Sequence, residues 1–262
     1  MNSNRRRFGV SGVVLAGLWA GVLCRPEAVW AAGPSSLCQA PLVVALDVGH
    51  TLAQPGATSA RGHTEYSYNK ALAEAVLDTL HRTGYGSSFI VESTGAPILL
   101  QRRTTIAAER GATVLISLHH DSVQPRYLLD WDIDGHRQRY SDLFHGYSIF
   151  VSEKPAPQAA ASLALAREVA AALRATGLQP TLHHAADIPG ERRVLVDPVA
   201  GVYYFNELVV LRTATIPALL LESAVIVNRD EEQTAASPAF RLRVSQALLA
   251  GLKHWNQKRC GN

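Results

Sequence analysis

From Pro41 to its end, this chain of 262 residues alternates short apolar runs rich in β-branched residues with longer stretches whose apolar residues recur at helical spacing. Such alternation is typical of a mostly parallel sheet covered by helices. The predicted strands are residues 42–46, 89–91, 113–118, 148–152 and 217–222, and the predicted helices are residues 65–82, 98–110, 159–176 and 238–255. We therefore expect one α/β domain over residues 32–262, with a mostly parallel sheet of about six strands and helices on both faces.

Two segments do not follow this alternation, residues 123–145 and residues 179–202. The first is rich in charged and aromatic residues, and the second is rich in proline and glycine. Long segments of this kind within a compact domain are often walls or lids of a binding site. We expect both to be surface loops, in which His183, His184 and Arg193 either line a substrate groove or have no specific role.

The first 31 residues have the three-part pattern of a secretory signal. Consecutive arginines begin at Arg5, an apolar run covers residues 10–23, and a small-residue cleavage site lies at residues 29–31. The run is shorter than the about 20 residues that cross a bilayer, which favours cleavage over a membrane anchor. The arginines followed by Phe8 resemble a twin-arginine export signal, although an ordinary basic start has the same composition. We expect an exported protein of the periplasm or cell envelope of a bacterium, without a membrane span after cleavage.

Removal of residues 1–31 changes both the charge and the cysteine content. This segment holds four arginines and one glutamate, so the mature part has 21 basic and 21 acidic residues and is formally neutral. Such a balance does not predict nucleic-acid binding. Cleavage also removes Cys24 and leaves Cys38 and Cys260, which we expect to form a disulfide in an oxidising compartment, the alternative being two free thiols near the chain ends.

Three potential metal ligands follow predicted strands or open a predicted helix. His50 lies after the first strand, Glu65 opens the first helix, and His119 lies after the third strand. Because the carboxyl ends of parallel strands face one crevice, these residues can converge there. Two imidazoles and one carboxylate leave one position of a tetrahedral zinc ion open, which is the pattern of a catalytic site. From spacing alone, other histidines could replace members of this set, namely His63, His120, His183 or His184.

A carboxylate also ends the apolar strand predicted at residues 217–222. A buried, unpaired glutamate is costly, so Glu222 should point into the crevice or meet a cation. Near a zinc ion it could take a proton from water and pass it to a leaving nitrogen, as general base and acid. The alternative is a carboxylate that caps a helix or forms an ion pair.

Several blocks of the sequence resemble the zinc-dependent N-acetylmuramoyl-L-alanine amidases of the type-3 amidase group. The resemblance covers nearly the whole mature chain. The blocks are residues 46–51 with Gly56-Ala57 behind them, Gly62 to Glu65, residues 100–103 with Ala107-Ala108, residues 117–121, and Pro217 to Glu222 with Asn228 beyond. The chain departs from the family pattern at Val48, Thr51-Leu52 and Ser223, which affects loops rather than ligands.

The resemblance implies that His50, Glu65 and His119 bind one Zn²⁺ and that Glu222 is the catalytic carboxylate. It implies a peptidoglycan hydrolase that cleaves the amide bond between N-acetylmuramic acid and L-alanine by zinc-activated water. The alternatives are zinc hydrolysis of another cell-wall peptide or amide bond, and a non-catalytic wall-binding homologue. Some relatives carry a helix that plugs the zinc site until an activator removes it. Residues 123–145 form a short segment without helical apolar periodicity, so we expect substrate to reach the zinc site without an activator. The sequence does not indicate whether an activator protein exists.

Overall fold

A computed structural model describes residues 41–260, and its centre is one sheet of seven strands. The strands are β1 (Val44–Val48), β2 (Phe89–Ile90), β3 (Val114–Asp121), β6 (Ser148–Val151), β7 (Val194–Asp197), β8 (Val202–Tyr204) and β9 (Ala218–Val225). Their order across the sheet is β2-β1-β3-β9-β6-β8-β7. β6 is antiparallel to β9 and β7 is antiparallel to β8, whereas all other neighbours are parallel.

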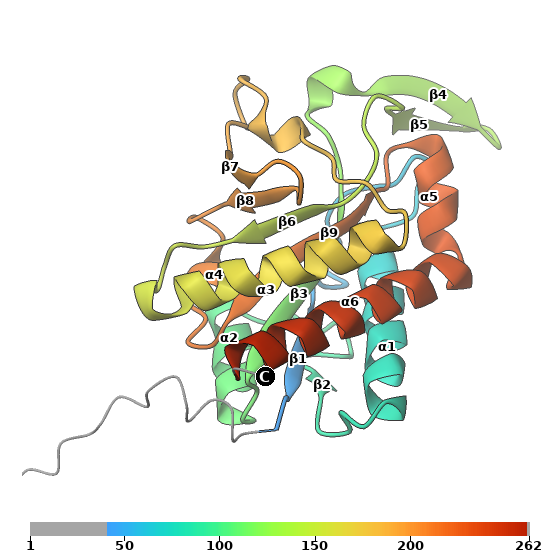
Figure 1. Cartoon of the computed structure of the whole chain (residues 1–262). Coiled ribbons are helices and arrows are strands. Elements are labelled where there is room, and N and C mark those ends of the chain that lie inside the picture. Colours follow the sequence, from blue (N-terminus) through green and yellow to red (C-terminus); the bar gives the residue numbers. More distant parts are fainter. Residues whose placement is uncertain (1–40, 261–262) are drawn as a thin grey trace, which may run out of the picture.

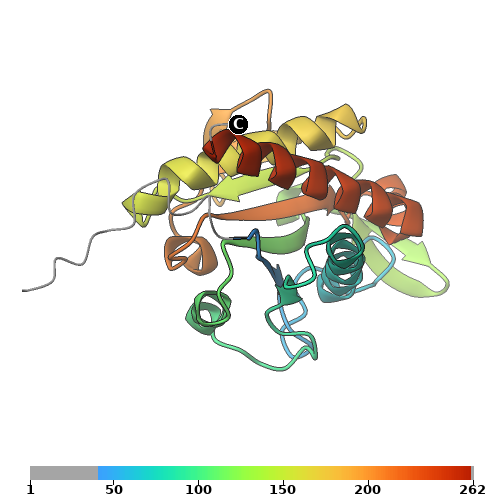
Figure 2. The same ribbon diagram turned by 60° about the horizontal axis from the view of Figure 1, so that its bottom comes forward.

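Helices cover both faces of this sheet (Figure 1). They are α1 (Glu65–Arg82), α2 (Leu100–Glu109), α3 (Ala156–Ala175), α4 (Val209–Arg212), α5 (Arg229–Ala236) and α6 (Pro238–Arg259). The larger core lies between the sheet and α1, α3 and α6, and a smaller core lies under α2 and α4. Figure 2 shows α3 and α6 on one side of the twisted sheet and α2 and α4 on the other.

Local sequence explains where several helices begin and end. Glu65 lies in the first turn of α1 and Arg82 in its last, where their charges complement the helix dipole. Asn228 caps α5 by accepting hydrogen bonds from two backbone N–H groups, and Ser237 caps α6 in the same way from one.

The sheet and its helices confirm the predicted α/β class, the mostly parallel sheet and the cover on both faces.

Three details of the prediction are wrong. The segment predicted as a surface loop at residues 179–202 contains β7 and leads into β8, and these two strands belong to the seven-stranded main sheet. Residues 123–145 are also not an irregular loop. They form a 3-10 turn, η1 (Pro125–Tyr127), and a separate hairpin of β4 (Leu129–Ile133) and β5 (His136–Tyr140). β3 runs three residues beyond its predicted end, so His119 lies within the strand rather than after it.

Parts of the sequence interpretation lie outside the described residues. The predicted signal at residues 1–31 and Cys38 belong to these parts. Cys260 is disulfide-bonded, and its pairing with Cys38 stays a prediction. Between residues 41 and 260, no helix combines the length and the apolar character needed to cross a membrane.

Candidate active site

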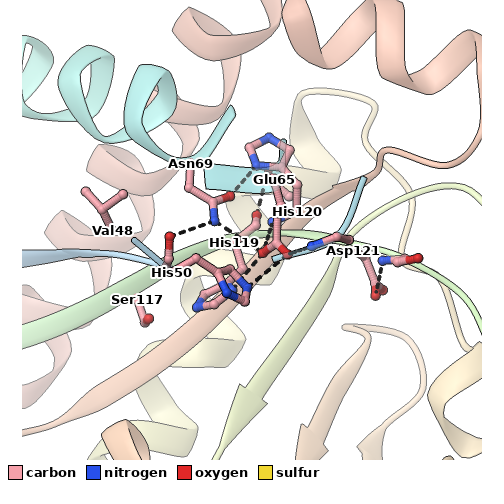
Figure 3. Close-up of polar contacts among 12 residues, drawn as sticks. Val48, His50, Glu65, Asn69, Ser117, His119, His120 and Asp121 are labelled. Carbon is pink, nitrogen blue, oxygen red and sulfur yellow. Dashed lines mark hydrogen bonds and ion pairs between the residues drawn. The ribbon is translucent and has the colours of Figure 1, made fainter. Parts of the chain in front are cut away.

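Two imidazoles and one carboxylate meet at the carboxyl ends of β1 and β3 (Figure 3). Nε2 of His50 is 2.9 Å from one carboxylate oxygen of Glu65, and Nδ1 of His119 is 2.9 Å from the other. Burial acts to raise the pKa of Glu65, but the hydrogen bonds with His119 and His50 hold it well below its ordinary value. The structure thus brings the three predicted ligands together, with their donor atoms within 4.8 Å of one another.

Two glycines allow this close approach. Gly49 precedes His50, and a Cβ atom at Gly49 would overlap the His119 ring. Gly56 has a φ of 78°, and a Cβ atom there would overlap both the Glu65 carboxylate and the His50 ring. Glycine is required at Gly56 both for the left-handed backbone and for the space that the ligands occupy.

A buried arginine of α2 holds the loop that carries His50. Arg103 is 3% exposed and forms a 2.6 Å salt bridge with Asp47, whose other oxygen accepts a hydrogen bond from Ser117. The guanidinium also donates to the backbone carbonyls of Val48 and His50. His50 has a φ of 70°, which is unfavourable for a residue with a side chain. The bonds from Arg103 therefore hold a strained backbone in place.

A buried network behind Glu65 fixes its carboxylate. Nδ2 of Asn69 donates to Glu65 and to the carbonyl of Gly49, each at 3.2 Å, and its Oδ1 is 2.8 Å from Nδ1 of His120. The N–H of Ala57 donates to the second Glu65 oxygen at 3.0 Å. His120 faces α1 rather than His50, and burial lowers its pKa to about 3, so it is a neutral hydrogen-bond donor in this network.

Replacing Asn69 by alanine is expected to weaken Zn²⁺ binding about 10- to 100-fold, because partners that orient a metal ligand contribute that much to affinity. Competition with a chromophoric chelator measures the change. Gln233→Ala is the matched control, since this exposed amide on α5 donates to the Arg229 carbonyl of the same helix, belongs to neither the Glu65 network nor the ligand cluster, and should leave affinity unchanged. Equal affinity of Asn69→Ala and the wild type would show that Glu65 does not depend on this network.

Glu222 stands beside His119 on the neighbouring strand. β3 and β9 pair with His119 opposite Glu222, so both side chains point to the same face of the sheet. Oε2 of Glu222 is enclosed and has no hydrogen-bond partner among residues 41–260. Burial raises the pKa of Glu222 well above its ordinary value, and the charges of Asp121 and Glu65 add to this effect. Asn228 rather than Glu222 caps the following helix.

Two cavities share His50 and His119 in their walls. One, of about 410 Å³, also contains Glu222, His184 and Arg193 in its lining. The other, of about 420 Å³, is bordered by apolar residues that include Leu99 and Leu100. Because Leu208 and Leu220 line both, the two cavities are neighbours across the histidine pair. Of the three loop residues singled out from the sequence, His184 and Arg193 thus line the cavity, whereas His183 is buried beside His184.

Two acidic residues near Glu222 have no assigned role from sequence. Asp121 follows His119 on β3, and Glu191 lies in the segment between η2 (His183–Ala185) and β7. His184 lies between them, with Nε2 2.7 Å from Asp121 and Nδ1 2.9 Å from Glu191. Burial acts to lower the pKa of His184, but these two carboxylates raise it to about 9. No local pattern in the sequence indicates this contact, because folding alone brings the three residues together.

The fold and the site define a class of protein, namely a single-domain α/β protein with a candidate metal centre at the carboxyl end of its sheet. The family model described as N-acetylmuramoyl-L-alanine amidase matches residues 44–254. The chain therefore belongs to the N-acetylmuramoyl-L-alanine amidase family, whose members are peptidoglycan hydrolases. The family resemblance inferred from the sequence blocks is confirmed.

Individual relatives agree with this assignment. The chain is 26% identical to the N-acetylmuramoyl-L-alanine amidase AmiA of Escherichia coli over 82% of its own length and 78% of that protein. It is 25% identical to the probable amidase AmiB of Haemophilus influenzae, of which it spans 52%.

Solved structures share the fold. The catalytic domain of the amidase CwlV from Bacillus (Paenibacillus) polymyxa superposes with a TM-score of 0.59 at 24% identity, covering 82% of this chain and 98% of that one. The amidase Ami1 from Mycobacterium smegmatis gives 0.64 at 18% identity, covering 84% and 98%.

Proposed function

We propose that this protein is a zinc-dependent amidase that cleaves the bond between N-acetylmuramic acid and the L-alanine of the stem peptide. In this proposal His50, Glu65 and His119 hold the ion, and Glu222 moves the proton. The observation that carries the proposal is the unpartnered carboxylate oxygen of Glu222, enclosed in register beside His119.

The donor set supports zinc as the ion. Two imidazole nitrogens and one carboxylate are ligands that zinc prefers, and three protein ligands are typical of catalytic rather than structural zinc sites. The short contacts between Glu65 and both imidazoles indicate atoms that are arranged around one position. When bound there, Zn²⁺ would act as a Lewis acid that polarises the amide carbonyl and makes water more acidic.

Glu222 has the position and environment of a proton carrier. It shares a cavity wall with His50 and His119, so it can reach water and substrate at the same point. In the proposed reaction it accepts a proton from the attacking water and then donates it to the leaving nitrogen of L-alanine. Its raised pKa favours the donating step. A cation held by His50, Glu65 and His119 would act in the opposite direction and favour the carboxylate form of Glu222, which accepts the proton.

The two cavities support a substrate that extends past the metal ligands. The polar one, with Arg193 and Glu222, suits charged or hydrogen-bonding parts of a glycan or peptide. The other offers apolar surface, since Leu99 is 77% exposed at its edge. We propose that the polymer lies across both, with the scissile amide at His50 and His119.

The segment that carries a plug in some relatives supports access without an activator. Residues 129–140 form the β4–β5 hairpin, which Trp131 fastens to the domain by a 2.8 Å hydrogen bond from Nε1 to the Ala60 carbonyl. Neither strand of this hairpin contributes to the cavity that contains Glu222. We propose that the enzyme acts without a partner, and that it is exported to the periplasm or cell envelope, where its polymer substrate lies.

Digestion of purified sacculi tests the activity, the metal and the activator together. The purified enzyme is expected to release muropeptide ends with new L-alanine amino termini, detected by amino-terminal labelling and mass spectrometry. Removal of metal by a chelator should abolish release, and Zn²⁺ should restore it. Cleavage at another bond would replace the amidase proposal by a different zinc hydrolase. No products, even with zinc and envelope extract, would favour a non-catalytic wall-binding protein, and products only with extract would contradict free access.

A further inference from the structure

A second pair of imidazoles, those of His183 and His184, faces the carboxylate of Asp121 in the wall of the cavity that contains Glu222. Nε2 of His184 is 2.7 Å from Oδ2 of Asp121, and Nε2 of His183 is 3.4 Å from the same oxygen. The donor atoms of these three side chains lie within 4.8 Å of one another. His183 is 6% exposed, and its Nε2 has no hydrogen-bond partner among residues 41–260.

Hydrogen bonds to the other ring nitrogens fix how both imidazoles are oriented. Nδ1 of His184 is 2.9 Å from Glu191, and because a carboxylate only accepts, this nitrogen carries the proton. Glu191 is in turn held by a 2.9 Å hydrogen bond from Gln124. Nδ1 of His183 is 2.9 Å from the hydroxyl of Thr181, which can accept in the same way. Metal-ligating histidines are commonly oriented by such oxygen acceptors on their second nitrogen.

This arrangement turns three electron-pair donors toward one point. Without an ion, Nε2 of His184 also carries a proton, which it donates to Asp121. A cation that takes the place of this proton would meet a lone pair on Nε2 of each ring and the negatively charged Asp121. One proton on His184 relieves only the contact with His184 and leaves Nε2 of His183 without a partner. A divalent cation between them satisfies all three donors at once.

We propose that Asp121, His183 and His184 bind a second divalent cation, with zinc as the preferred ion. The donor set repeats the two imidazoles and one carboxylate of the first cluster, which suits zinc. Asp121 and His184 line the cavity that also contains His119 and Glu222, so an ion can enter from the solvent. The inference goes beyond the proposed amidase reaction, which uses only the first cluster. A cation there gives the cavity an anchor for a carboxylate of the substrate.

Counting bound zinc tests this site directly. The untagged mature protein is stripped with a chelator, reloaded with Zn²⁺, dialysed, and measured by plasma mass spectrometry. Two ions per chain are expected in the wild type, one in His183→Gln or His184→Gln, and one in His50→Gln, which loses the first site instead. His136→Gln is the matched control, because this exposed histidine of the hairpin belongs to neither cluster and should retain both ions.

An affinity measurement keeps the test informative if a ligand variant misfolds. Glu191→Gln leaves the three donors in place and is expected to weaken the second ion alone about 10- to 100-fold in chelator competition. One ion in the wild type, or two ions in folded His183→Gln and His184→Gln, would overturn the second site. If the wild type binds a single ion that is lost in His50→Gln but kept in His183→Gln, the second site is overturned while the first cluster is still a zinc site. The two proposals can therefore fail separately.

Discussion

Replacing Glu222 by glutamine is expected to lower the rate of amide hydrolysis about 10²- to 10⁴-fold, the range that a general acid or base contributes. Glutamine has nearly the same shape as glutamate, but near neutral pH its amide accepts no proton from water and donates none to the leaving nitrogen. Zinc content should be unchanged, because Glu222 is not among the three proposed ligands of the first cluster. Release of new L-alanine amino termini from sacculi measures the rate, and plasma mass spectrometry measures the zinc.

A second glutamate provides the control for this prediction. Glu207 is exposed in the turn before α4, next to the cavity-lining residues Phe205 and Leu208. Glu207→Gln removes the same charge near the same cavity and should keep wild-type activity. Because Oε2 of Glu222 is enclosed and has no hydrogen-bond partner among residues 41–260, its replacement should not lower the melting temperature. Full turnover by Glu222→Gln would remove this residue from the mechanism, whereas loss of zinc in the variant would assign it to metal binding instead.

Replacing Arg103 by alanine is expected to lower the free energy of unfolding by about 3–5 kcal/mol, because removing one partner of a buried pair leaves the other charge uncompensated. Asp47 is buried and keeps only the hydrogen bond from Ser117 once the guanidinium is gone. The carbonyls of Val48 and His50 lose their donors as well. Denaturant unfolding of the zinc-free protein measures the change, and a weaker affinity for Zn²⁺ should accompany it because the His50 loop is no longer held.

The neighbouring arginine, Arg102, provides a control that carries the same charge but is not buried. Arg102 lies on the exposed side of α2 and pairs with Glu109 at 2.9 Å, so Arg102→Ala should cost less than about 1 kcal/mol. The double variant Arg103→Met with Asp47→Asn should recover much of the stability lost in Arg103→Ala, since it removes both charges. If Arg103→Ala were no less stable than Arg102→Ala, the buried pair would not be what holds the strand ends together.

Elements with strong local patterns could be predicted well. The bounds of α1, Glu65–Arg82, agree with the prediction, because apolar spacing, an acidic first turn and Gly84 all indicate the same limits. The β4–β5 hairpin was not predicted, since charged residues interrupt both of its strands, and β7 was not predicted, since its short apolar run lies in a segment rich in proline and glycine. The antiparallel insertion of β6 beside β9 also has no local signal. Strand order depends on which strands pair, and that is a property of the whole chain.

The candidate site also contains residues that the sequence predicted and residues that only the structure identified. The resemblance to the amidases predicted His50, Glu65, His119 and Glu222 as site residues; the structure brings the first three together and places His50, His119 and Glu222 in the wall of one cavity. The residues that support them could not be predicted from the sequence, because Arg103 and Asn69 act through hydrogen bonds to the His50 loop and to Glu65 that depend on the tertiary structure. The same holds for His183 and His184. Their sequence neighbourhood does not indicate that both face Asp121.

By itself, the sequence determined the α/β class, the order of the long helices and buried strands, and the family, and through the family resemblance it predicted the four residues of the candidate catalytic centre. Hydrophobic periodicity and ordered motifs carry this information, and both can be read within short stretches of chain. Only the tertiary structure decided the strand order, the buried salt bridge beneath His50, the unpaired state of Glu222 and the cluster around Asp121. These depend on distances between segments far apart in the chain, which packing sets and which no local pattern records.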